Sequence, residues 1–137
     1  MIRPATLLLA AAFALTASGT PLLAASPPAI ELDQQVRCTI IFELVAGMQD
    51  HHSGGSERFA PMDRPGMKFM SKTIDRLQAE RGIPEKKVQD FFMEQVKVIV
   101  PPLAAEKDTD AAIDAEMAAC LPLLDQVVPD WRKSPAD

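Results

Sequence analysis

Two cysteines, Cys38 and Cys120, restrict the possible folds of this chain more than any other feature of its sequence. Each lies on the apolar side of a segment with helical periodicity, and they are the only thiols present. In an oxidising compartment such a pair is expected to form a disulfide. Closing a loop of roughly 80 residues would stabilise the fold by about 4 to 5 kcal/mol. The alternatives are two buried free thiols or a Cys/His metal site, although zinc would require four more closely spaced ligands.

The N-terminus predicts export from the cytosol. Arg3 is followed by an apolar run of 11 residues, 7–17, and then by small and turn-forming residues, which is the layout of a secretory signal peptide. A helix needs about 20 residues to cross the hydrocarbon core, so an uncleaved span is the weaker interpretation. We expect a signal peptide at 1–25, or cleavage after Gly19 instead, and a periplasmic or secreted protein. No later apolar stretch is long enough to predict a membrane span after signal removal.

Four segments show the three- and four-residue apolar spacing of amphipathic helices. In the first, residues 30–48, the apolar positions cover an unusually broad face, so this helix is expected to contact more than one neighbour. The second follows a long loop, residues 49–66, that is rich in Gly, Pro, Ser and Asp. It ends at Arg81 and Gly82, a cationic last turn followed by a residue suited to a left-handed cap. Its expected inward-facing residues are Met67, Met70, Ile74 and Leu77.

Prolines limit the third and fourth helices. The third is expected to end or kink near Val100, because Pro101 and Pro102 remove two N–H donors and disfavour helix in the preceding residue. Its expected inward-facing residues are Val88, Phe91, Phe92, Val96, Ile99 and Leu103. The fourth helix contains Pro122, which predicts a kink or the start of a new short helix. Its expected inward-facing residues are Ile113, Met117, Cys120, Leu121, Leu124 and Val128.

These segments predict an all-α fold, a small antiparallel bundle of about four helices within residues 26–137, followed by a polar C-terminal tail. No run alternates between apolar and polar residues convincingly enough to predict a sheet. The cysteines agree with an up-down-up-down order, because antiparallel first and last helices would place both thiols about 12 Å from the same end of the bundle. We therefore expect one disulfide to join helix one to helix four.

Charge is unevenly distributed along the chain. The formal net charge is -5, so a nucleic-acid partner is not expected. Residues 64–97 nevertheless contain eight basic and five acidic side chains, whereas residues 105–137 contain three basic and eight acidic ones. The two halves could attract one another, or one could face a partner of opposite charge, but solvated helix surfaces are the simpler explanation.

Candidate catalytic residues are few. The loop that contains His51, His52, Ser53 and Ser56 has an imidazole base and a hydroxyl nucleophile, but it lacks the Gly-x-Ser-x-Gly turn that would present the serine. Phosphate-binding and dinucleotide-binding patterns are absent as well. Glu43 is the one carboxylate that a helical wheel places within an apolar arc. A buried acid there could be functional, although an edge-exposed or arginine-paired glutamate is the more usual explanation. We predict no enzymatic activity and no cofactor.

The leading hypothesis is a non-enzymatic binding module that contacts an unknown protein partner in the cell envelope. Such a module predicts an exposed apolar patch or a dimer, whereas an enzyme predicts a pocket with converging polar groups. The alternative is a periplasmic copper-binding protein that uses His51, His52 and Met62, because imidazole and thioether groups suit Cu(I). Against copper, methionines elsewhere in the sequence already serve as helix core residues.

Overall fold

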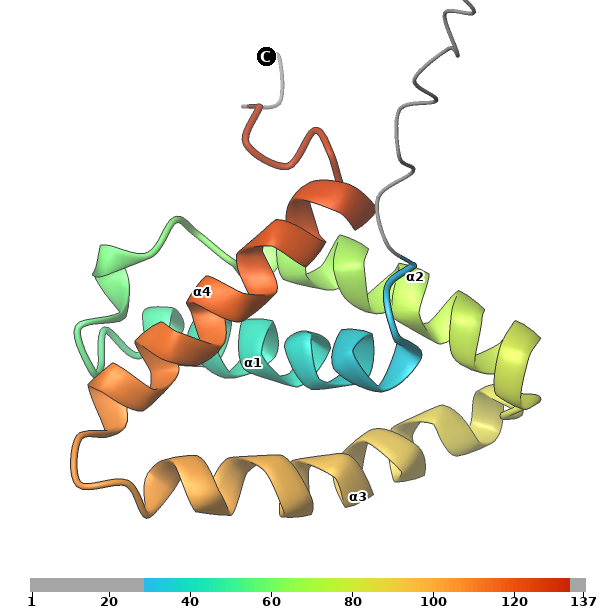
Figure 1. Cartoon of the computed structure of the whole chain (residues 1–137), viewed down its shortest axis with the longest axis horizontal. Coiled ribbons are helices and arrows are strands. Elements are labelled where there is room, and N and C mark those ends of the chain that lie inside the picture. The colour runs from blue at the N-terminus through green and yellow to red at the C-terminus, as the bar shows by residue number, and fades with distance from the viewer. Residues whose placement is uncertain (1–28, 134–137) are drawn as a thin grey trace, which may run out of the picture.

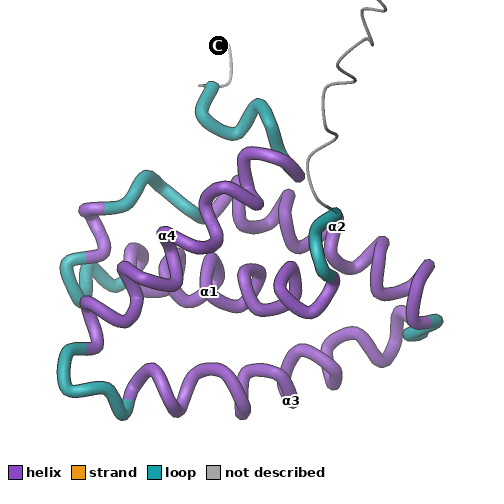
Figure 2. Tube along the Cα trace, viewed as in Figure 1, coloured by secondary structure: helices purple, strands orange, loops and turns teal. Residues whose placement is uncertain are grey.

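The computed structural model describes residues 29–133, which form four α-helices and no strand within that range (Figures 1 and 2). The elements in chain order are α1 (Leu32–Asp50), the short 3-10 helix η1 (Ser56–Arg58), α2 (Asp63–Arg81), α3 (Glu85–Ala104) and α4 (Thr109–Val127). The all-α prediction is confirmed. The predicted signal peptide, residues 1–25, lies outside the described residues.

The chain reverses direction at each connection, which gives the expected up-down-up-down order (Figure 1). Helix α1 lies in the middle of the bundle and contacts α2, α3 and α4. Its buried side chains are spread around most of the helix, from Leu32 to Ala46. A helix with neighbours on several sides needs such a broad apolar surface, and the prediction that this segment contacts more than one neighbour is confirmed.

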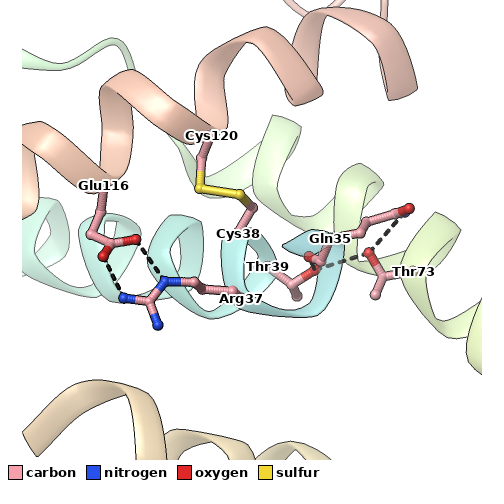
Figure 3. The surroundings of a disulfide bond; sticks show 7 residues. All are labelled: Gln35, Arg37, Cys38, Thr39, Thr73, Glu116 and Cys120. Carbon is pink, nitrogen blue, oxygen red and sulfur yellow. Dashed lines mark hydrogen bonds and ion pairs between the residues drawn. A yellow bond between two sulfur atoms is a disulfide. The ribbon is translucent and has the colours of Figure 1, made fainter. Parts of the chain in front are cut away.

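A disulfide between Cys38 and Cys120 joins α1 to α4, as predicted (Figure 3). The two Cα atoms are 5.3 Å apart and the bridge closes a sequence separation of 82 residues. Beside it, Arg37 and Glu116 form a two-pronged ion pair, in which Arg37 Nε donates to Glu116 Oε2 at 2.9 Å and Nη2 donates to Oε1. Covalent and charge-assisted contacts therefore hold α1 and α4 together at the same place.

The loop between α1 and α2 is shorter than the predicted 49–66, because α1 extends to Asp50 and α2 already begins at Asp63. Pro65 lies in the first turn of α2, where a proline is tolerated because the first N–H groups of a helix have no partner within it. Gly66 lies one position further on, close against Phe42 of α1. Composition alone suggested a loop here, but both residues serve the start of a helix.

Gln49 organises this loop from the last turn of α1. Its Nε2 donates to the carbonyl oxygens of Ser56 at 3.2 Å, Phe59 at 3.2 Å and Ala60 at 3.0 Å. Its Oε1 accepts a hydrogen bond from the Met62 backbone N–H at 2.9 Å. One side chain thus contacts four backbone groups of the loop, and of these the Ser56 carbonyl oxygen also accepts from the Phe59 N–H.

The buried face of α2 differs from the predicted one. Met67 is 64% exposed, whereas Phe69 and Thr73 are completely buried together with Leu77. The Phe69 ring meets Phe42 of α1 edge to face, with centroids 5.0 Å apart. Residues with little bulk, Gly66 and Thr73, let α2 approach α1 closely, and this contact rotates the helix away from the stripe that apolar spacing indicated.

Prolines do not end the last two helices. Helix α3 continues through Pro101 and Pro102 to Ala104, so the expected end near Val100 is wrong, and Leu103 is buried in the core. Helix α4 is likewise one helix through Pro122. Each missing N–H would have bonded the carbonyl four residues earlier, and Lys97, Val98 and Ala118 at those positions are exposed to water. Water can therefore take the place of the lost hydrogen bonds.

Candidate functional site

A groove of about 690 Å³ opens between α2 and α3, and α1 contributes to its lining. Apolar side chains line it on both sides: Met70, Ile74, Val88, Phe92 and Met93. This volume lies within the range of ligand-binding pockets, roughly 300 to 1,000 Å³. The groove is the best candidate for a binding site in the described part of the chain, because it combines apolar surface with isolated charged groups.

The groove exists because α3 is fixed mainly at its two ends. Val88 is buried near its start, and Ile99 and Leu103 are buried near its end. Between them Phe92 is only half-buried, and Met93 is 52% exposed. The middle of α3 therefore packs only partly against the core, and it leaves apolar surface of Phe92 and Met93 open to the groove.

Glu43 of α1 reaches the groove from behind. Its Oε1 is buried, and none of the described residues donates a hydrogen bond to it. Gly66 of α2 lies directly against this oxygen, since a Cβ added there would be 3.3 Å from it. Burial raises the pKa of the Glu43 carboxyl above its ordinary value. The sequence placed this acid within an apolar arc, and the structure places it among apolar neighbours beside a cavity.

The lack of a partner for Glu43 is notable because its neighbours on the same stripe of α1 have partners. Gln35, Thr39 and Glu43 follow one another at four-residue intervals. The Gln35 Nε2 donates to Thr73 Oγ1 at 3.1 Å, and the hydroxyls of Thr39 and Thr73 are 2.9 Å apart (Figure 3). Arg76 Nη1 in turn donates to Gln35 Oε1 at 2.6 Å. Helix α2 thus satisfies the first two polar groups of the stripe and meets the third with a glycine.

The charged groups that line the groove are all acidic. They are Glu43, Asp75 and Glu85, and no lysine or arginine of the described residues lines it. This composition contrasts with residues 64–97 as a whole, which contain more basic than acidic side chains. The basic residues of α2 and α3 do not line the groove, so the charges nearest to a ligand there are negative.

A slightly larger cavity, about 810 Å³, lies beside the turn between α3 and α4. Alanine and proline contribute much of its lining, and its two oppositely charged residues from α1 and α4, Arg37 and Glu116, already bind each other. Leu103 is the one large apolar side chain among the described residues of its lining, and none of them carries an unpaired buried charge, so we assign the candidate site to the α2–α3 groove.

The residues of the copper hypothesis are placed differently from one another. His51 and His52 are exposed in the turn after α1, whereas Met62 is completely buried in the core. The His52 Nδ1 lies 3.5 Å from Glu57 Oε1. Within residues 29–133 no group of three or more His, Cys, Asp or Glu side chains is arranged to hold a metal ion. The imidazoles and the thioether therefore do not share one accessible surface. Copper binding itself stays a prediction.

Sequence reasoning missed the groove itself. Met70, Ile74 and Phe92 were expected in the core, and the structure instead leaves them half-buried along the groove. Met93 had no assigned role because it falls outside the apolar period of α3. Two exposed apolar residues on that helix, Met93 and Val98, are the signal that more apolar surface is present than the bundle buries.

No helix among residues 29–133 is both long enough and apolar enough to cross a bilayer. Comparison of the chain with protein-family models, curated protein sequences and solved structures finds no match.

Proposed function

We propose that the protein is an exported, non-enzymatic binding module that takes an apolar segment of a cell-envelope protein into the α2–α3 groove. The observation that carries this proposal is the groove's apolar lining, half-exposed on α2 and α3 although both helices belong to the bundle. Apolar surface left open to water on a folded domain is typical of interaction sites. Burying it against a partner would supply most of the binding free energy.

Export is supported by two independent features. Near the N-terminus, Arg3 precedes a short apolar run, residues 7–17, which is followed by small residues, as in signal peptides. Both of its cysteines are oxidised in a disulfide, a bond that persists in extracytosolic compartments. The partner is accordingly expected in the periplasm or outside the cell.

Binding is favoured over catalysis by the chemistry of the lining. Its polar side chains are carboxylates, glutamines and one threonine, among apolar neighbours. The threonine, Thr39, is already engaged with Thr73. An acid in such surroundings can recognise a ligand, whereas acid-base chemistry would need a second group positioned to exchange a proton with the substrate.

Photo-crosslinking tests whether the groove contacts the partner. A benzoyl-phenylalanine at Met93, inside the groove, is expected to yield a discrete higher-mass adduct in the envelope of cells that export the protein. The same residue at Val98, on the same helix, or at Met67 should yield none. Both control positions are exposed to water and neither lines the groove.

The comparison between positions decides the result. Adducts of the same mass at Met93, Val98 and Met67 would reflect random collisions and would contradict the proposal. Absence of an adduct at Met93, in a variant that exports and folds normally, would contradict it as well. An Ile74→Arg variant, which places a charge and extra bulk in the groove, should suppress the Met93 adduct while leaving the circular dichroism spectrum unchanged.

A further inference from the structure

We propose that the partner segment carries a lysine or arginine among its apolar side chains, and that this cation binds Glu43 within the α2–α3 groove. The inference rests on the proposed function and adds the chemistry that the partner must have. Three features of the site support it: an unsatisfied carboxylate, charged lining residues of one sign, and apolar walls that suit the stem of a long basic side chain.

The first feature is the unsatisfied oxygen of Glu43. A buried acceptor without a hydrogen bond costs the folded protein free energy, because its hydration is lost and nothing replaces it. Gly66 of α2 lies against this oxygen and has no side chain that could donate to it, and no other described residue does so. A donor from a bound partner would remove this cost, so the carboxylate favours occupants that bring one.

The second feature is charge complementarity. Asp75 of α2 and Glu85 of α3 line the same groove as Glu43, and neither is engaged in an ion pair among the described residues. Three like charges repel one another and repel an acidic ligand. A cationic group between them gains attraction from all three, and an uncharged apolar segment gains none.

The third feature is geometry. Glu43 lies on the helix behind the groove, while Met70 and Phe92 stand on its two sides. A lysine or arginine can lay its methylene stem along such apolar walls and place its charged end at the carboxylate. The site thus selects for segments that are both apolar and basic.

Titration calorimetry with defined peptides tests the inference. The probe is an amphipathic peptide of leucine and serine with one central lysine, and matched peptides carry norleucine or glutamate there. The lysine peptide is expected to bind the wild-type protein about tenfold more tightly than the norleucine peptide, as a charge-assisted hydrogen bond would give. The Glu43→Gln variant should lose this difference. Glu106→Gln, the same change on an exposed residue outside the groove, should keep it.

Several results would overturn the inference. Equal affinities for the lysine and norleucine peptides would do so, as would equal losses in Glu43→Gln and Glu106→Gln, since binding would then follow net charge. Octylammonium chloride provides a further arm. If this small amine binds in a Glu43-dependent manner and the lysine peptide does not, the occupant is a small amphiphile and the polypeptide partner is wrong. Thermal unfolding of Glu43→Gln verifies that the variant is folded.

The two proposals fail in distinguishable ways. If all three peptides bind the wild-type protein with equal affinity and none binds the Ile74→Arg variant, the groove is a binding site without cation specificity. If no peptide binds and Met93 gives no photo-adduct, the proposed function itself is refuted.

Discussion

At the scale of single residues, Glu43 links stability to pH. Its carboxyl pKa is raised in the folded state by burial, so the folded protein binds this proton more readily than the unfolded chain does. Ionisation of the Glu43 carboxyl therefore lowers the stability of the folded state. The cost is absent well below the ordinary pKa of 4.5 and is fully present above the raised folded pKa.

The first prediction follows from the direction of the Glu43 pKa shift. Glu43→Gln should raise the free energy of unfolding at pH 7, because the amide carries no charge to desolvate, and the gain should shrink as the pH falls through 4.5. Denaturant unfolding of both proteins at pH 3.5 and pH 7 measures it. A stability difference that is the same at both pH values would show that the charge of Glu43 is not the cause.

Gln49 leads to a second prediction at the residue scale. Gln49→Ala should destabilise the protein by about 1 to 3 kcal/mol, because buried or half-buried backbone groups lose their partners. The loop at residues 51–62 should then be cut faster by proteases. Gln34→Ala, an exposed glutamine on the same helix, is the matched control and should change the stability by less than about 0.5 kcal/mol. Equal effects of the two changes would contradict the role of Gln49.

At the scale of secondary-structure elements, the face of α2 that is buried in the structure differs from the face that apolar spacing predicts. Phe69→Ala should cost about 3 to 5 kcal/mol, because it leaves a cavity against Phe42 in the core. Met67→Ala, at a position that the pattern assigned to the core, should cost less than about 0.5 kcal/mol. Chemical denaturation of both variants checks the prediction, and a larger loss from Met67→Ala would mean that α2 is rotated as the pattern suggested.

The elements also show which features a sequence can predict. Helix number, order and the disulfide followed from apolar spacing and from the two cysteines, because these signals are local or nearly unique in the chain. The rotation of α2 could not be predicted, since it depends on how closely Gly66 and Thr73 allow α1 to approach. The continuation of α3 past Pro101 and of α4 past Pro122 could not be predicted for a similar reason, because whether water can replace the missing hydrogen bonds depends on which side of the helix is exposed.

The candidate site was predicted only in part. Glu43 stood out because an acid within an apolar arc is visible on a helical wheel. The groove did not, because its existence depends on the distance at which α3 settles from α2, and half-buried residues such as Ile74 and Phe92 have the same spacing as core residues.

At the scale of the whole molecule, the disulfide between α1 and α4 restricts the unfolded chain and can be removed without leaving a charged or polar group unpaired. Replacing Cys38 and Cys120 by alanine should lower the free energy of unfolding by about 2 to 5 kcal/mol, since the unfolded chain regains the freedom that an 82-residue separation restricts. Denaturation of wild type with and without reductant should reproduce the loss. The double variant should be insensitive to reductant, and a variant as stable as the oxidised wild type would contradict the prediction.

The attachment of α3 by its two ends has a consequence for selectivity. Val88 and Ile99 anchor the helix on either side of the groove, while Met93 between them bears no load in the core. Unbranched methionines on both walls, Met70 and Met93, can change rotamer to fit side chains of different shape. If the groove binds a partner segment as proposed, it would therefore accept apolar side chains of several sizes and would select among segments by their charge.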